Sequence, residues 1–524
     1  DPDLGGSTST FDLVGRTISS TDARGVTLAY TYDDLGRRTG VYQGSSTGTR
    51  LAAWTYDATD LDTGGVAKGQ PSSSTRYVTV AGTTEAYTTS TDGYTATYQS
   101  TGTTITIPDS ETGLAGSYSY QTWYHQDGSI ESVTSPETGD LAIESVATEY
   151  TPYGQPRRLT AFYGTTHTSY ISDTEYDALA RPTQYTRYTG LYSETGGRVY
   201  QGTEWELETG RPHRTVVQRD AVTPNTVADL TYGYDHAGNI EKIADTPAGG
   251  AADHQCFSYD QLGRLTEAWT PTSGDCATAR TTTALGGPAP YWQSWSYDAV
   301  GRRQTQTSRT PAATAATNYH YPTGTQQPHA LTSTTTQTGT TTTTAEYGYD
   351  AAGHTTRRPL AAGAQTLAWD AEGHLATTTD AGGATDYVYD ADGNRLIRRD
   401  ATGKTLYLPD ADLRYTTATG KATATRYYRY DGQLVAQRTS AGITWLVGDR
   451  HGTQQLAVDA RTQQVTQRRE TPFGTTRGAA PSWPNALGFV GGTTDPTGLT
   501  HLGAREYDPI IGRFSSVDPK IDFG

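Results

Sequence analysis

The sequence predicts an all-β protein in which repeated hairpins stack into one long spiralling antiparallel sheet. Three observations predict this class: an aromatic-Asp motif that recurs at short intervals, an unusual composition, and the lack of a helical period long enough for a helical domain. Only 34% of the residues are hydrophobic, yet there are 37 Tyr and 9 Trp, so the core must consist largely of aromatic rings with polar tips. Aromatic and β-branched residues favour strands, and so many aromatics disfavour disorder.

The motif is an aromatic residue, Asp, two variable residues and Gly, usually followed by Arg, Asn or His. The copies that begin at residues 349, 369 and 389 are 20 residues apart. The copies are "FDLVGR" at 11, "YDDLGRR" at 32, "YDALARP" at 176, "YDHAGNI" at 234, "YDQLGRL" at 259, "YDAVGRR" at 297, "YDAAGHT" at 349, "WDAEGHL" at 369 and "YDADGNR" at 389. Such a period indicates a repeat protein.

Each part of the motif has a physical interpretation. A second aromatic often stands two residues before the Asp-linked one, as in Tyr30 and Tyr32, and strand alternation places both rings on one face. Asp accepts hydrogen bonds from backbone N–H groups two residues on, and Gly takes the positive φ that ends the turn. The unit is therefore a β-hairpin of about 20 residues that cannot bury its aromatic face alone. Stacked neighbours bury it, with edges only at the ends of the array.

Two less regular regions are predicted to continue the same sheet. The Thr-rich tract at residues 332–346 lies between aromatic-Asp units, so we interpret it as solvent-facing strand rather than linker. Residues 60–150 keep strand alternation that is broken by Asp-Gly and Glu-Thr-Gly turns.

The net charge and the lack of a long apolar run argue against several classes of partner. The formal net charge of −16 argues against nucleic-acid binding, which normally needs a basic surface, and against docking on anionic lipid. No apolar run of about 18 residues occurs, so we expect no membrane span. The chain begins at Asp1 and contains no Met. We therefore expect it to be a processed or excised piece of a longer protein, with any signal peptide outside it.

The two cysteines, Cys256 and Cys276, allow one disulfide. A bridge would close a loop of about 20 residues and stabilise the fold by roughly 3 kcal/mol in the chain-entropy model. Two free thiols are the alternative, and two cysteines do not fix the compartment. Because both residues flank one hairpin-like unit, the sequence favours the bridge.

The aromatic-Asp-x-x-Gly-Arg unit resembles the YD repeat of rearrangement-hotspot (Rhs) proteins, of the C components of bacterial Tc toxins, of wall-associated polymorphic toxins and of animal teneurins. Repeats of this kind run over residues 11–440. The segments "GDRHGTQQLAVD" (448–459), "ETPFGTTRG" (470–478) and "LGFVGGTTDPTGLTHLGAREYDPIIGRFSSVDP" (487–519) resemble the Rhs-associated core. The resemblance divides the chain into a YD-repeat shell at 1–445 and a core at 446–524.

This resemblance implies a hollow β-shell that encloses a polypeptide cargo, which in toxin members is the C-terminal toxin domain of the same chain. The family's aspartyl autoprotease and the toxin would lie beyond residue 524, so we expect neither enzymatic activity nor a cofactor here. The implied partners are the enclosed toxin and delivery machinery, and the implied location is secreted or associated with the cell surface or cell wall. The alternative function is an adhesin whose outer face binds glycan or protein, with exposed aromatics such as Trp483 or Tyr192 as contacts.

Several short motifs are similar to catalytic or metal-binding motifs, but we interpret them as turns and loops. Residues 44–48, "GSSTG", match a nucleophile elbow but lack its strand-to-helix context, so we expect a loop. His354 and His374 would lie near each other after stacking, but no third or fourth metal ligand is evident. Residues 390–395, "DADGNR", lack the later ligands of a calcium loop. Residues 495–499, "DPTGL", share the letters of the family's cleavage region but precede the core signature, and we interpret them as an Asp-Pro-x-Gly turn.

The stretch "REYDPIIGRFSSVDP" at 505–519 fits the repeat pattern with one residue added. Gly512 follows Asp508 by four positions, whereas Gly36 follows Asp33 by three. We interpret it as the last turn of the array, formed by Tyr507, Asp508, Gly512 and Arg513. Pro509 would rigidify the loop and Pro519 would stop the strand.

Overall fold

The computed structural model describes residues 2–80, 82–163, 166–189 and 197–518. Three 13-stranded antiparallel sheets follow one another along the chain, and each strand pairs with its neighbours in sequence order. A four-stranded sheet follows them. The helical elements of the described residues are two single 3-10 turns, η1 (Thr282–Ala284) and η2 (Phe489–Gly491). No helix of this described part has the length and apolarity needed to cross a membrane. The all-β, stacked-hairpin fold class is therefore confirmed.

The strand bounds are as follows. The first sheet contains β1 (Thr8–Phe11), β2 (Thr17–Thr21), β3 (Thr27–Tyr32), β4 (Arg38–Gln43), β5 (Thr49–Tyr56), β6 (Pro71–Val80), β7 (Thr83–Tyr94), β8 (Ser100–Ile107), β9 (Gly116–Tyr124), β10 (Ile130–Ser135), β11 (Glu144–Tyr150), β12 (Pro156–Tyr163) and β13 (Thr166–Ile171). The second contains β14 (Asp173–Tyr176), β15 (Pro182–Arg187), β16 (Val199–Trp205), β17 (Pro212–Arg219), β18 (Thr226–Tyr234), β19 (Ile240–Asp245), β20 (Asp253–Tyr259), β21 (Leu265–Trp269), β22 (Trp292–Tyr297), β23 (Arg303–Arg309), β24 (Thr314–His320), β25 (Ser333–Thr338) and β26 (Thr341–Glu346). The third contains β27 (Gly348–Tyr349), β28 (Thr355–Leu360), β29 (Gly363–Trp369), β30 (Leu375–Asp380), β31 (Gly383–Tyr389), β32 (Arg395–Asp400), β33 (Gly403–Tyr407), β34 (Ala411–Thr416), β35 (Lys421–Tyr430), β36 (Gln433–Thr439), β37 (Gly442–Gly448), β38 (Gln454–Asp459) and β39 (Val465–Gln467). The fourth contains β40 (Thr493–Thr494), β41 (Thr500–Leu502), β42 (Arg505–Asp508) and β43 (Arg513–Phe514).

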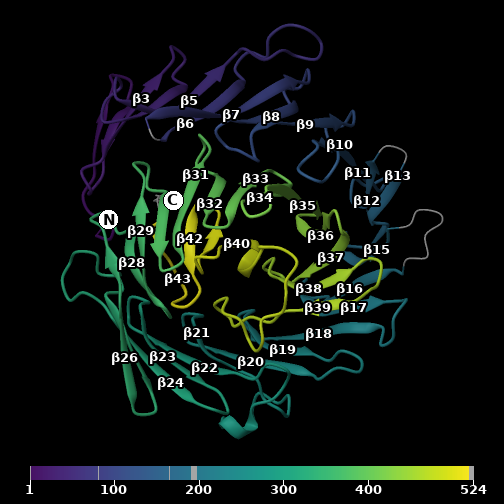
Figure 1. Ribbon diagram of the computed structural model, residues 1–524. Helices are drawn as coiled ribbons and strands as arrows, with labels where there is room; N and C mark the ends of the chain where they lie inside the picture. Colours follow the sequence, from purple (N-terminus) through teal and green to yellow (C-terminus); the bar gives the residue numbers. More distant parts are fainter. Residues whose placement is uncertain (1, 81, 164–165, 190–196, 519–524) are drawn as a thin grey trace.

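The sheets wind as a spiral. In Figure 1 the strands from β3 to β26 form most of an outer ring, with β28 and β29 at its left margin, and the strands from β31 to β39 and β40, β42 and β43 lie within it. We call β1–β26 the first circuit and β27–β39 the second circuit. The Thr-rich tract forms β25 and β26, and residues 60–150 contribute strands β6 to β11, as the sequence predicts.

The Asp-x-x-Gly segment forms the same turn in successive repeats. In the turn after β3, the N–H of Gly36 donates to the carbonyl of Asp33, and Gly36 has a φ of +81°. The Asp33 carboxylate accepts from the backbone N–H groups of Leu35 and Arg37 and from Arg37 Nε at 2.7 Å. The Asp therefore both closes the turn and orients the cation that follows the Gly.

The aromatic residue just before the turn makes a hydrogen bond to the neighbouring hairpin. In most repeats this residue precedes the Asp of the motif, and a residue other than Asp follows it at Tyr94, Tyr124, Tyr150, Trp205 and Tyr321. The aromatic side chain donates to the carbonyl of the first residue of the strand alongside, over 2.5–3.1 Å. The donor and acceptor pairs are Tyr32 and Thr17, Tyr56 and Arg38, Tyr94 and Pro71, Tyr124 and Ser100, Tyr150 and Ile130, Tyr176 and Pro156, Trp205 and Pro182, Tyr234 and Pro212, Tyr259 and Ile240, Tyr297 and Leu265, Tyr321 and Arg303, Trp369 and Thr355, and Tyr389 and Leu375. Each bond thus joins one hairpin to the preceding one.

The side chain after the Gly covers the next aromatic ring of the array. Arg37 lies over the ring of Tyr56, with its guanidinium carbon 4.4 Å from the centroid. His354 stacks on Trp369 at 4.7 Å, and His374 stacks on Tyr389 at 4.6 Å. The Arg or His slot of the motif is therefore a packing position between successive repeats.

The two circuits share hydrophobic cores. One core joins β12, β13 and the second sheet to β35–β38, where the Tyr170 ring stacks on the Tyr428 ring at 3.6 Å and Trp445 is fully buried. A second core joins β7–β9 to β31–β35. The packing of one circuit on the other therefore buries the apolar residues that single hairpins expose.

We predict that replacing Tyr234 by Phe lowers stability by about 1 kcal/mol, because the Pro212 carbonyl loses its 2.7 Å hydrogen bond while the ring remains. Urea denaturation followed by tryptophan fluorescence measures the change. Tyr98→Phe is the matched control, because the Tyr98 side chain is half exposed. Equal midpoints for the two variants would show that the hydroxyl bond contributes nothing.

Candidate functional site at the seam and the C-terminal hairpins

The contacts between the two circuits form a seam that contains buried carboxylates. Glu144, at the start of β11, has a side chain that is 1% exposed. It accepts from the hydroxyl of Tyr170 at 3.0 Å and from that of Tyr428 at 2.5 Å. Arg426 and Arg438 of the second circuit also donate to it, at 3.2 and 2.8 Å. One carboxylate of the first circuit thus holds two cations of the second.

Glu111 plays the same part on the loop between β8 and β9. Its buried carboxylate accepts from the Tyr87 hydroxyl at 2.7 Å, from Lys404 Nζ at 2.9 Å, and from Arg399. Burial alone would raise the pKa of Glu111, but the hydrogen bonds from Arg399 and Lys404 outweigh it and lower the pKa to about 2.

Acid should therefore weaken the seam through Glu111. Because its folded-state pKa lies below the ordinary value of 4.5, its stabilisation is present above that pH and is lost as the pH falls towards 2. The linkage amounts to about 3 kcal/mol. We predict that Glu111→Gln is several kcal/mol less stable than the unmodified chain at pH 7 and that this difference shrinks by about 2 kcal/mol at pH 3, where Glu111 of the folded chain is still largely ionised. Urea denaturation at both values measures it, with Glu208→Gln, on an exposed turn, as control. A difference that stays constant with pH would contradict the assignment.

The C-terminal hairpins are held on the second circuit by two buried aspartates. Asp495 is fully buried and accepts from Arg395 Nη1 at 2.7 Å and from Arg398 Nη1 at 2.6 Å, both on β32. Asp508, at the end of β42, accepts from Arg358 Nη1 at 2.7 Å. Arg358 also donates to the Thr497 carbonyl. β40–β43 form a sheet of their own, and a backbone hydrogen bond from the Thr355 N–H to the Ser515 carbonyl joins its end to the second circuit.

Replacing Asp495 by Ala should release the C-terminal hairpins before the sheets unfold. The buried Arg395 would lose its counter-charge and Arg398 would keep only Asp400, a loss of about 3–5 kcal/mol. We predict that trypsin cleaves this variant after Arg477 or Arg505, the arginines that flank residues 478–504, at concentrations that leave the unmodified chain intact, with mass spectrometry locating the cut. Asp34→Ala, on an exposed turn, serves as control. Equal resistance of both variants would show that the hairpins do not depend on Asp495.

The predicted motif residues all belong to turns. Residues 44–48 form an exposed turn between two strands, with no helix after it. Asp390 accepts from the backbone and side chain of Asn394, as in the other repeats. In residues 495–499, the Gly498 N–H donates to the Asp495 carbonyl, and Leu499 is buried against Tyr389 and its neighbours. Asp508 and Gly512 close a hairpin turn between β42 and β43. Pro519 lies outside the described residues.

The two histidines are engaged in their own repeats. His354 Nδ1 lies 2.9 Å from Asp350, and His374 Nδ1 lies 3.1 Å from Asp370. Asp370, Glu372 and His374 are close enough to surround an ion, but Glu372 is paired with Arg76 of the first circuit. The three side chains lie close together because Asp370 and His374 bond within their turn and Glu372 bonds across the seam.

Of the aromatics expected to contact glycan, Tyr192 lies outside the described residues. Trp483 is partly buried on the cluster around Leu446, and the guanidinium of Arg468 lies 4.2 Å from its ring centroid. The ring face that a sugar would need is therefore covered by Arg468.

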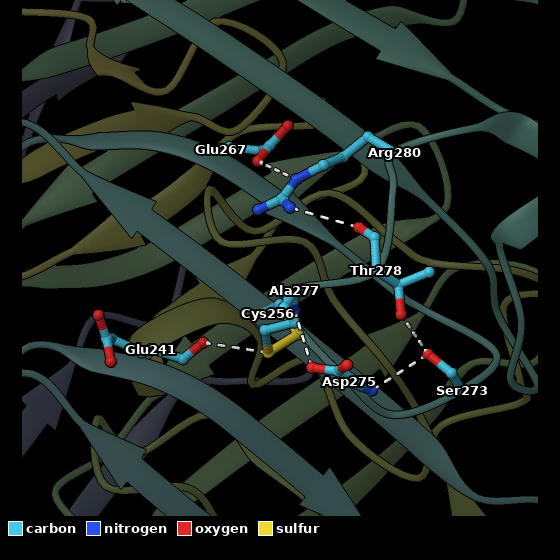
Figure 2. The surroundings of a disulfide bond; sticks show 9 residues. Glu241, Cys256, Glu267, Ser273, Asp275, Ala277, Thr278 and Arg280 are labelled. Carbon is cyan, nitrogen blue, oxygen red and sulfur yellow. Dashed lines mark hydrogen bonds and ion pairs between the residues drawn. A yellow bond between two sulfur atoms is a disulfide. The ribbon is translucent and has the colours of Figure 1, made fainter.

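Cys256 and Cys276 are joined by a disulfide, with Cα atoms 5.6 Å apart (Figure 2). The bridge connects β20 to the long loop between β21 and β22. Cys256 packs with Trp269 and Leu285. Hydrogen bonds of Ser273 with Thr278, and of Ala277 with Asp275, order the same loop. The disulfide thus holds the long loop between β21 and β22 against β20.

Sequence reasoning missed the residues of the seam. Glu111 and Arg399 are separated by 288 residues, and neither stands in the repeat motif. Glu144 likewise contacts Arg426 across 282 residues. No local pattern marks such pairs. The targets of the tyrosine hydroxyls were also missed, although the fixed position of Tyr before Asp was the available signal.

The strand order, the repeated turn and the aromatic bonds between hairpins can be compared with known proteins. Residues 213–523, more than half of the chain, match the family model of the teneurin YD-shell. This chain belongs to the teneurin YD-shell family. A second model, that of the RHS repeat, matches residues 11–47 of this YD-shell.

Known relatives cover the YD-shell to different extents. It is 35% identical to Teneurin-1 of Gallus gallus over 98 residues, which are 18% of this chain and 4% of that protein. It is 32% identical to Teneurin-1 of Homo sapiens over 106 residues, which are 20% of this chain and 4% of that protein. The matched part is thus a small fraction of the teneurins.

Solved structures show the same fold over the whole chain. The crystal structure of TcdB2-TccC3-Cdc42 superposes with a TM-score of 0.77 at 19% identity, covering 99% of this chain and 27% of that one. A mutant Tc holotoxin pore of Photorhabdus luminescens gives a TM-score of 0.76 at 18% identity, covering 99% of this chain and 26% of that one. The YD-shell therefore spans about a quarter of the length of these toxin chains.

Proposed function

We propose that this YD-shell is a wall of a bacterial toxin's encapsulation shell, which encloses a polypeptide cargo until delivery. The observation that carries the proposal is the continuous spiral whose two circuits are joined by buried charge, with a fold that matches toxin-complex chains over 99% of its length. A closed spiral leaves few strand edges with which an unfolded cargo could pair. Secretion and contact with delivery machinery belong to the same proposal.

An apolar row along the first circuit supports a larger shell. The third position of the repeat turn is apolar and 63–89% exposed at Val14, Leu35, Tyr153, Leu179, Leu262 and Val300. The turn is Asp-x-x-Gly at four of these and begins with Thr151 or ends with Ala180 at the other two. In the second circuit this position faces the first circuit. There Asp392 accepts from Trp54 Nε1 at 3.0 Å, and Glu372 pairs with Arg76. The exposed row therefore suits packing against a further circuit of sheet.

The division of the chain at residue 445 remains part of the proposal. Residues 446–524 hold β38, β39 and the hairpins β40–β43, and β37 crosses the boundary. On this proposal, the second part closes the inner end of the spiral, and the Asp495 and Asp508 contacts attach it to the first.

The test uses the natural polypeptide that contains this chain. We expect electron cryomicroscopy to show density inside the shell and proteinase K to spare the enclosed segment, because the wall excludes the protease. Asp495→Ala should speed its digestion, and Asp34→Ala should not. An empty interior with digestion as fast as that of a free linker would refute encapsulation. Saturable binding of the intact chain to a cell-wall glycan would favour an adhesin instead.

A further inference from the structure

A cavity of about 410 Å³ lies between the second sheet and the segment that follows the second circuit. Ile243 of β19, Phe257 of β20 and Leu265 of β21 line one side. Pro472 and Phe489 line the other. The volume is at the lower end of the range of small-ligand sites, and these walls favour an apolar ligand body.

Glu470 brings a carboxyl group without a hydrogen-bond partner to this cavity. Its side chain is 17% exposed, and no group of the described residues donates a hydrogen bond to it. The nearest cation is Arg468, whose Nε lies 3.8 Å from Oε1, beyond hydrogen-bond length. A buried carboxyl without a partner is costly, so its retention here points to a group that the protein alone does not supply.

The other charged groups around Glu470 make hydrogen bonds of their own, although Arg468 Nη2 has no partner. Arg468 donates to the carbonyls of Gln454 and Leu487 and lies over Trp483. Asp449 accepts from the backbone N–H groups of His451 and Thr453 in its own turn. Burial raises the pKa of Glu470 to about 7, with Arg468 opposing the rise and Asp449 adding to it. An anionic ligand would meet two carboxyl groups here, and an uncharged apolar one would leave Glu470 without a partner.

We propose that this cavity binds an organic cation, an alkylammonium or alkylguanidinium group on an apolar stem, with the charge at Glu470 and the stem along Phe257 and Phe489. The rings add an attraction for the cation or its methylene groups. A lysine or arginine side chain of a polypeptide has this chemistry, and so does a free amine. The proposal does not depend on encapsulation.

The test titrates the intact chain with n-butylguanidinium and, as the probe of opposite charge, with butyrate, by calorimetry and saturation-transfer NMR. We expect millimolar binding of the cation and none of butyrate. Glu470→Gln should weaken cation binding at least tenfold, and Glu131→Gln, on the exposed start of β10, should leave it unchanged. Circular dichroism and the thermal midpoint confirm that both variants are folded. If Glu470→Gln does not fold, Phe257→Leu provides the second test, with weaker binding of the cation expected.

The pH dependence is a second readout. Ionisation of Glu470 rises from about one tenth at pH 6 to about nine tenths at pH 8, so affinity should rise about tenfold. The other titratable or charged side chains that line the cavity are Tyr259, Asp449, His451 and Arg468. Binding of acetyl-Gly-Arg-Gly-amide as tight as that of n-butylguanidinium would support a polypeptide source, and binding of the small cation alone would support a free amine. Unsaturable binding up to about 10 mM, equal binding of butyrate, or binding unchanged in Glu470→Gln would overturn the proposal.

Discussion

The hydrogen bond from a Tyr or Trp just before the turn to a carbonyl of the preceding hairpin is the interaction on which the array depends. Strand pairing alone does not fix where one hairpin must end relative to the next. A side-chain donor that reaches the first carbonyl of the neighbouring strand, as the Tyr234 hydroxyl reaches Pro212, sets that position in most repeats. Because the contact is between neighbours only, its contribution adds up along the chain as in other repeat proteins.

The same position also supplies curvature. The register of strand pairing shifts at the motif aromatic, for example between Thr31 and Tyr32 and between Ser296 and Tyr297. A bulge of this kind bends a strand and increases its twist. Repeated at one margin of the sheet, such bulges bend it in one direction, which lets a second circuit pack on the first. The motif therefore specifies both the unit and the spiral.

The sequence predicts what is local and repeated, and it fails where contacts join distant segments. The turn of Asp33 to Gly36, the strand faces and the Thr-rich strands follow from residue chemistry within one repeat. The sequence shows Arg, Asn or His at the position after the Gly. The structure explains why Arg and His both occur there, because the side chains of Arg37 and His354 each pack on the aromatic ring of the next repeat. Glu111 and Glu144 could not be predicted, because their partners lie in the other circuit.

The turn at residues 495–499 both closes a C-terminal hairpin and attaches that hairpin to the second circuit. Residues 495–499 follow the Asp-x-x-Gly pattern, yet the Asp495 carboxylate, which in a repeat would bond its own turn, accepts instead from Arg395 and Arg398. Buried ion pairs of this kind are a weak source of net stability, because desolvation offsets their attraction. They are costly to break, however, and they require one arrangement of the groups. Such contacts can therefore position a segment inside the spiral that forms a sheet separate from the second circuit. The charges of Asp495 and Asp508 therefore specify where the inner end of the sheet lies rather than how stable it is.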